Sequence, residues 1–165
     1  MVTTTIATLT GPDRSGLLQL LAKLTHEHHG VWRQSKVINV GGQTAILLEI
    51  AVSEESLGPL QQQFLAITNL HCHFSVPKDV TGLNAETIIS IDANDRPGIM
   101  HDVTQALLEL DINITHSEQQ RMSATNLDSP VLRAKLNLSL PAGVTPTSVV
   151  SALESLPGQI RASAG

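Results

Sequence analysis

Two stretches of the chain alternate apolar and polar residues in the manner of β-strands with one buried face. Residues 131–140, VLRAKLNLSL, place leucine or alanine at every second position, with Arg133 and Lys135 among the residues between them. Residues 44–52, TAILLEIAV, alternate less cleanly, because Ala45 and Leu47 lie on the face opposite Ile46 and Leu48. We therefore expect the second face of this strand to be partly covered, by the rest of the chain or by another chain.

Four helices are predicted along the chain, two of them from the helical spacing of apolar residues. Positions 17, 18, 20, 21 and 24 predict an amphipathic helix over about 15–29, and positions 99, 100, 103, 106, 107 and 110 predict another over about 97–110. A further helix is expected within 54–69, with a late or irregular start suggested by Gly58-Pro59. The fourth begins at TPTS, with Thr145 as N-cap and Pro146 at the first helical position.

The chain repeats itself at an offset of 82 residues. This shift aligns Asp13 with Asp95, Arg14 with Arg96 and Gly16 with Gly98, each after a strand-like run. A tight hairpin turn is expected at VGGQ, residues 40–43, and a longer one in the second copy at 123–130. Short strands over 71–76 and 159–163 close the two copies. Each copy then has the order β-α-β-β-α-β, an α+β fold of the ferredoxin-like kind, and we place the two domains at 1–83 and 84–165.

Composition argues against several classes of function. The net charge is −5 and the lysines and arginines form no cluster longer than two residues, so direct binding to nucleic acid is not expected. Cys72 is the single cysteine, which rules out an internal disulfide and a thiolate metal cage within one chain. The N-terminus does not resemble a signal peptide, and no apolar run approaches the roughly 20 residues of a membrane span. These features favour a cytoplasmic protein.

The repeated segment resembles the signature of ACT domains. Residues 95–100, DRPGIM, followed by DINI at 111–114, match the pattern D-x-P-G-[LI]-[LI] and then G/D-I-N-I. The first copy departs from this pattern, because Ser15 replaces the proline and Val31 stands where the signature has asparagine. Two such units fill the chain, and GPDRSGL at 11–17 is similar to the glycine cleavage system transcriptional repressor family.

The resemblance implies a binding site for a small amino acid, formed where the strand–helix loop meets the second strand of an adjacent unit. From the residues themselves, Asp95 is expected to cap the helix, and the amides of Gly98 and Ile99 to receive a carboxylate. Asn113 offers both a donor and an acceptor. The alternative is that these residues only shape the helix start, and that Arg14 and Arg96 form surface ion pairs. The candidate ligand-binding residues are Asp95, Arg96, Pro97, Gly98, Ile99, Asn113 and Ile114, together with Asp13, Arg14, Ser15 and Gly16.

Histidines and Cys72 offer weaker candidates for chemistry. His26 and His29 share a helix face, and His71 and His73 share a strand face, but no third metal ligand is fixed by spacing. We expect solvated histidines and no metal site. Cys72 points to the opposite face from its two histidine neighbours, so we interpret it as a small core residue. No catalytic residue and no cofactor are expected.

Three functions remain open at this stage. The first, implied by the resemblance, is a non-enzymatic regulator that senses an amino acid, glycine by family likeness. It would repress transcription through contact with a DNA-bound activator protein rather than with DNA. The second is a regulatory subunit that gives feedback control of an amino-acid metabolic enzyme, and the third is a small enzyme that uses the histidines. A homodimer is one arrangement for the first two. The second copy keeps the full motif, so we expect the ligand there.

Overall fold

The computed structural model describes residues 1–79, 82, 84–123 and 129–165. The chain divides into two compact units, residues 1–80 (unit 1) and 81–165 (unit 2). The boundary predicted between residues 83 and 84 involves Leu83, which lies outside the described residues, and it stays a prediction.

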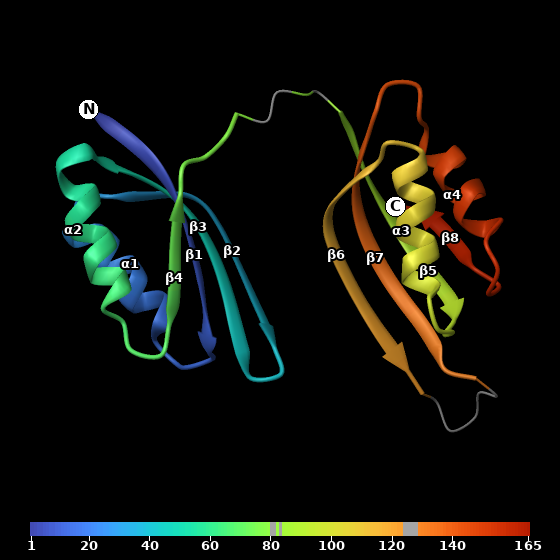
Figure 1. Ribbon diagram of the computed structural model, residues 1–165, viewed down its shortest axis with the longest axis horizontal. Coiled ribbons are helices and arrows are strands. Elements are labelled where there is room, and N and C mark those ends of the chain that lie inside the picture. The colour runs from blue at the N-terminus through green and yellow to red at the C-terminus, as the bar shows by residue number, and fades with distance from the viewer. Residues whose placement is uncertain (80–81, 83, 124–128) are drawn as a thin grey trace. The chain divides into compact units, whose positions relative to one another are not determined.

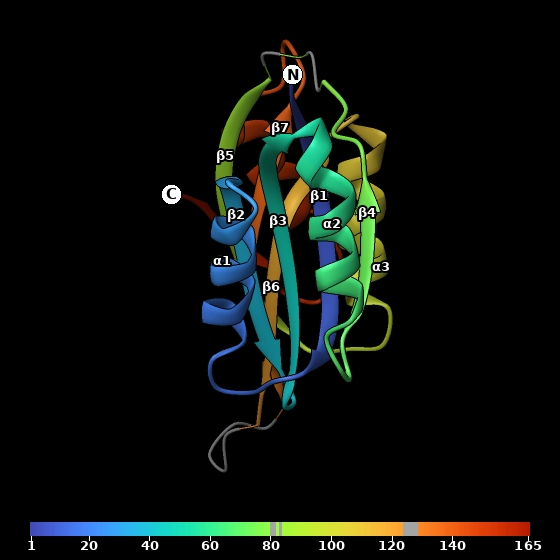
Figure 2. The ribbon, with the colours of Figure 1, turned by 90° about the vertical axis from the view of Figure 1, so that its left-hand side faces the viewer.

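Unit 1 is a four-stranded antiparallel sheet with two helices on one face (Figures 1 and 2). Its elements are β1 (Val2–Pro12), α1 (Leu17–Glu27), β2 (Val31–Val40), β3 (Gln43–Ser53), α2 (Glu54–Leu65) and β4 (His71–Ser75). The strands lie in the order β2-β3-β1-β4. In Figure 2 the helices α1 and α2 lie side by side in front of the sheet.

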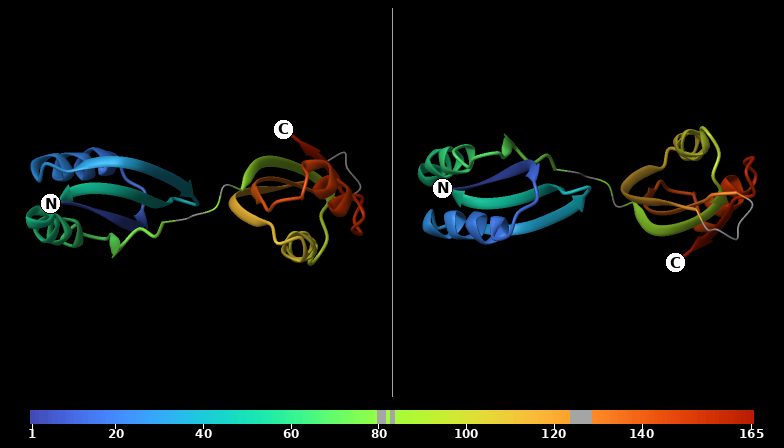
Figure 3. Two further views of the ribbon diagram at one scale, coloured as in Figure 1. Left: turned by 90° about the horizontal axis from the view of Figure 1, so that it is seen from above. Right: turned by 90° about the horizontal axis from the view of Figure 1, so that it is seen from below.

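Unit 2 repeats this architecture (Figure 3). Its elements are β5 (Ala85–Asn94), α3 (Ile99–Glu109), β6 (Asn113–Met122), β7 (Val131–Leu140), α4 (Pro146–Glu154) and β8 (Arg161–Ala164), and its strand order is β6-β7-β5-β8. The predicted fold, two β-α-β-β-α-β units of the ferredoxin-like kind, is confirmed. No helix among the described residues is long and apolar enough to cross a membrane.

Each unit has its own core, between the sheet and its helices. The alternation read from the sequence predicts the buried faces of β3 and β7 correctly. Thr44, Ile46, Leu48, Ile50 and Val52 are buried in β3, and Leu132, Ala134, Leu136, Leu138 and Leu140 are buried in β7. In unit 1, Leu21 of α1 and Leu60 and Phe64 of α2 pack against this face, and in unit 2 the corresponding contacts come from Val103, Leu107, Val149 and Leu153.

The helices differ from the prediction mainly at α2. The late or irregular start expected from Gly58-Pro59 is wrong, because α2 begins at Glu54 and carries Pro59 in its interior. Ser53 caps the helix by accepting a hydrogen bond from the amide of Ser56 at 3.2 Å, and Glu54 and Glu55 place negative charge in the first turn. Gly58 has no Cβ to clash with the following proline ring, which relieves the usual conflict at this position. The predicted cap at Thr145, with Pro146 first in α4, is confirmed.

The hairpin turn between β2 and β3 agrees with the prediction. Gly41 and Gly42 have φ angles of 58° and 77°, as the predicted tight turn between β2 and β3 requires. Most of the longer turn predicted at 123–130 lies outside the described residues. The last strand begins at Arg161 rather than at 159, because Gln159 adopts a φ of 51° that is incompatible with a strand.

Candidate functional site

The junction between β1 and α1 in unit 1 is held against the β2–β3 hairpin. The amide of Asp13 donates a hydrogen bond to the carbonyl of Gly42 at 2.9 Å, and the side-chain amide of Asn39 donates to the Asp13 carboxylate at 3.2 Å. Gly16, with a φ of 80°, is the N-cap residue of α1, and its carbonyl accepts from the amide of Leu20. The junction therefore presents one carboxylate, one amide side chain and the start of a helix to the same space.

That space is a hollow of about 300 Å³. Its volume is at the small end of the range for ligand sites, roughly 300–1,000 Å³. The lining residues are Asp13, Arg14, Gly16, Leu17, Leu18, Gln19, Val37, Asn39, Thr44 and Ile46. The first turn of any α-helix leaves N–H groups without intrahelical acceptors. A carboxylate can bind there while a nearby ammonium group is received by Asp13.

The matching junction in unit 2 is occupied by the protein's own side chains. The Nε of Arg121 lies 2.9 Å from the carboxylate of Asp95, and the Asp95 side chain is only 16% exposed. Arg121 stands 82 residues after Asn39, at the matching place in β6. An arginine thus neutralises in unit 2 the carboxylate that an uncharged asparagine contacts in unit 1.

The helix start of unit 2 also differs from what the sequence predicts. The expected cap by Asp95 is wrong, because Gly98 is the N-cap residue, with a φ of 81° and no side-chain cap bond. Pro97 precedes this cap and is outside α3. The amide of Ile99, expected to receive a ligand, donates to the carbonyl of Arg96 at 3.3 Å.

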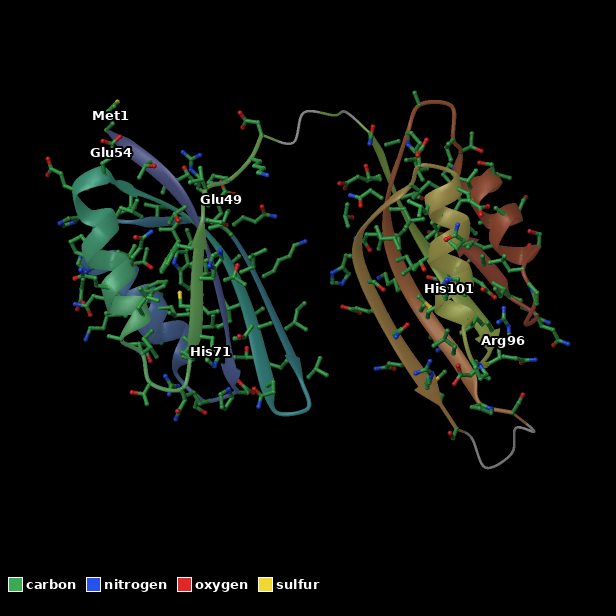
Figure 4. The ribbon with its side chains drawn as sticks, viewed as in Figure 1. Met1, Glu49, Glu54, His71, Arg96 and His101 are labelled. Carbon is green, nitrogen blue, oxygen red and sulfur yellow. The ribbon has the colours of Figure 1, made fainter. Side chains whose placement is uncertain are left out.

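Both motif arginines tie the junction to the loop that follows the second helix. Arg14 donates from Nη1 to the carbonyl of Thr68 at 3.1 Å. Arg96, labelled in Figure 4, donates from Nε and Nη2 to the carbonyl of Pro157 at 3.2 and 3.0 Å. It also pairs with Asp102 in the first turn of α3. Hydrogen bonds from Arg96 and then from His101 hold the pKa of the Asp102 carboxyl below its usual value.

Asn113 and Ile114 lie far from the junction of their own unit. Asn113 pairs with Ser139 at one end of β7, whereas Asn94, next to Asp95, pairs with Val131 at the other. Eight residues of strand, roughly 26 Å, separate the two ends. Ile114 packs against the core of unit 2. Unit 2 alone therefore does not bring Asn113 and Asp95 together.

The other hollows and side-chain groups of the structure are weaker candidates for a functional site. The hollow at the β5–β8 end of unit 2, about 440 Å³, contains none of the residues predicted from the sequence. Among the described residues, no group of three or more His, Cys, Asp or Glu side chains is placed to hold a metal ion. Cys72 packs partly buried against the unit 1 core, and burial raises the pKa of its thiol to about 11.

Comparison with known families agrees with the two-unit architecture. One family model described as an ACT domain matches residues 3–71, and a second with the same description matches residues 87–129. The chain is a tandem ACT-domain protein. No protein of curated function matches it significantly in sequence.

Two solved structures resemble this tandem ACT protein over its full length. An unknown protein from Galdieria sulphuraria has a TM-score of 0.84 at 16% identity, covering 99% of this chain and 98% of that one. A candidate glycine cleavage system transcriptional repressor has a TM-score of 0.71 at 16% identity, covering 100% of this chain and 97% of that one. At this level of identity the likeness shows the shared fold.

Sequence reasoning missed Asn39 and Arg121, which distinguish the two ACT junctions. Both residues lie outside the signature motif, near the far end of the second strand of each unit. Extending the 82-residue alignment beyond the motif would have paired these two residues. It would have shown that unit 1 has an uncharged side chain at the position where unit 2 has a cation.

Proposed function

We propose that this tandem ACT protein is a non-enzymatic, cytoplasmic regulator that responds to a small amino acid, glycine by family likeness. It represses transcription by contact with a DNA-bound activator protein. The hollow at the β1–α1 junction of unit 1 carries the proposal, because it combines an anionic side chain with a helix start in a small space. The full-length likeness to a candidate glycine cleavage repressor supports the regulatory role.

We place the amino acid first in unit 1. The sequence motif favoured the second junction, and that preference stays untested. The geometry favours the first, because Asn39 leaves the charge of Asp13 available to an ammonium group, whereas Arg121 already pairs with Asp95. The volume of the unit 1 hollow favours a ligand with a small side chain.

Calorimetric titration with glycine, alanine, serine and larger amino acids tests the site. Asp13→Asn should weaken binding about tenfold or more, equivalent to about 1.4 kcal/mol. Asp95→Asn, its matched control 82 residues later, should change the affinity less than twofold. Arg121→Ala should add a second binding event by freeing Asp95. The reverse ranking of the two aspartates would assign the ligand to unit 2, and no binding at millimolar concentration would refute amino-acid sensing.

Charge supports an indirect mode of repression. The chain from residue 84 onward holds 5 basic and 9 acidic residues, so unit 2 suits a basic protein surface better than a phosphate backbone. Affinity purification of the chain from its own cells tests this. Recovery of a DNA-bound transcription factor is the expected result, and recovery of a catalytic subunit would instead favour feedback control of an enzyme. Salt-dependent binding of the purified chain to DNA would refute indirect repression.

A further inference from the structure

The sheet of unit 1 exposes apolar side chains on the face that its helices leave uncovered. We define this open face by Ile6 of β1, Lys36 and Ile38 of β2, and Ala45, Leu47 and Glu49 of β3. The same side of the sheet also carries polar residues of β1 and β4, namely Thr8, Thr10, His71 and His73. Register places the residues that define the open face together, because Leu47 pairs with Lys36, Ala45 with Ile38 and Glu49 with Ile6. Ile38 is 50% exposed and Leu47 is 44% exposed. A shallow hollow of about 270 Å³ adjoins them, and His71, which is labelled in Figure 4, is one of its lining residues.

In unit 2 the corresponding face of the sheet carries charged side chains that are exposed to solvent. Matching the two hairpins strand by strand aligns Ala45 with Arg133 and Leu47 with Lys135, since Val40 pairs with Gln43 and Met122 with Val131. On that face Arg133 also forms an ion pair with Asp92 at 2.7 Å, and both side chains are about half exposed or more. The fold therefore accepts charged residues at these positions. Antiparallel sheets normally turn a polar side to solvent, so the apolar residues of unit 1 indicate a covered surface.

We propose that two copies of the chain pair through the open faces of their unit 1 sheets. A symmetric pairing requires a self-complementary surface, because each patch contacts its own copy. The open face meets this requirement with one cation, Lys36, and one anion, Glu49, on neighbouring strands around apolar residues.

The size of the face agrees with a pairing of moderate strength. Strands about 4.8 Å apart and about ten residues long, with β4 shorter, give a flat area of about 500 Å². Two such faces bury about 1,000 Å², the lower limit expected for a specific interface. We therefore expect a dimer that dissociates at micromolar concentration. The proposal does not depend on the ligand or on the mode of repression.

Sedimentation equilibrium of the full chain, from about 1 to 200 µM, measures the pairing. The wild-type mass should rise from the 17.6 kDa of one chain toward twice that value. Leu47→Lys and Ala45→Arg introduce the residues that unit 2 carries at the same positions, so the fold should tolerate them. Each should weaken the dimer at least about 30-fold, because two copies of an unpaired charge become buried. Leu65→Lys is the control, because Leu65 is 58% exposed on α2, away from the open face.

A charge exchange tests the symmetric contact itself. Lys36→Glu and Glu49→Lys should each weaken pairing, and the double variant should restore it. Circular dichroism on every variant confirms that it remains folded. A wild-type chain that stays at 17.6 kDa throughout would overturn the proposal and assign the face to a different protein or to unit 2. A dimer that survives Leu47→Lys as well as it survives Leu65→Lys would also overturn it.

Discussion

Arg96 offers a sharp test of whether the motif arginines act as structural ties. Its guanidinium donates twice to the carbonyl of Pro157 and also pairs with Asp102, so it joins the start of α3 to the loop between α4 and β8. Arg96→Ala removes these contacts without introducing a clash. If the arginine serves the fold, unit 2 should lose stability even when no ligand is present.

The expected loss follows from the two bonds to Pro157. A hydrogen bond that involves a charged group contributes about 1.5–3 kcal/mol when buried, and exposed pairs contribute about 0–1 kcal/mol. The Arg96 side chain is 30% exposed, so we expect a loss of about 1 kcal/mol in the free energy of unfolding of unit 2. For a domain of this size, that loss lowers the melting temperature by about 4–8 °C.

The single tryptophan allows each unit to be followed separately. Trp32 lies in unit 1, where its indole donates to the hydroxyl of Thr25 at 3.0 Å, so its fluorescence reports unfolding of unit 1. Circular dichroism reports both units. Arg96→Ala should lower the melting temperature only of the transition that circular dichroism detects and fluorescence does not. Arg14→Ala, which removes the bond to Thr68, should lower the melting temperature of the transition that fluorescence detects. An unchanged melting profile for Arg96→Ala would refute the structural role.

The pH dependence provides an independent check on the same contact. Since the pKa of Asp102 is lowered in the folded state, its stabilising effect is complete above the usual aspartate value of about 3.9. The effect is lost as the pH falls below that value. Arg96→Ala removes the main cause of the shift, so the difference in stability between wild type and variant should shrink in acid. A difference that stays constant down to pH 3 would contradict this account.

Two further predictions concern backbone conformation and thiol reactivity. Gly98→Ala should destabilise unit 2 by about 1–2 kcal/mol, because Gly98 has a φ of 81°. Gly98→Asn should cost less, and equal losses in urea unfolding would contradict the left-handed conformation as the cause. Alkylation of Cys72 at pH 8 should be about 100-fold slower than that of a free thiol of pKa 9, because burial raises its pKa to about 11. Unfolding in guanidinium should abolish the difference, and a fast reaction in the folded protein would show that the thiol is not protected.

The parts of the fold that the sequence predicts well are those fixed by local periodicity. The alternation over 131–140 is enough to identify the buried face of β7, because each side chain's face follows from its position along one strand. The start of α2 was missed because Gly58-Pro59 is a strong local signal. The cap at Ser53 and the acidic residues of the first turn lie upstream of this pair, and they stabilise a helix start at Glu54 more than Gly58-Pro59 disfavours it. The partner of Asp95 could not be read from the motif, since Arg121 reaches it from the far end of another strand.

The motif that identifies the family therefore describes the fold more directly than the ligand. In unit 2, which matches the signature best, Arg96 and Gly98 shape the junction, and Arg121 neutralises Asp95. These residues stabilise the strand–helix junction whether or not a ligand binds, so a close match to the signature reports the junction and not a ligand. Because both units share one architecture, the positions at which they differ carry more information about function than the positions at which they agree. Asn39 against Arg121 and Leu47 against Lys135 are two such differences, and both direct attention to unit 1.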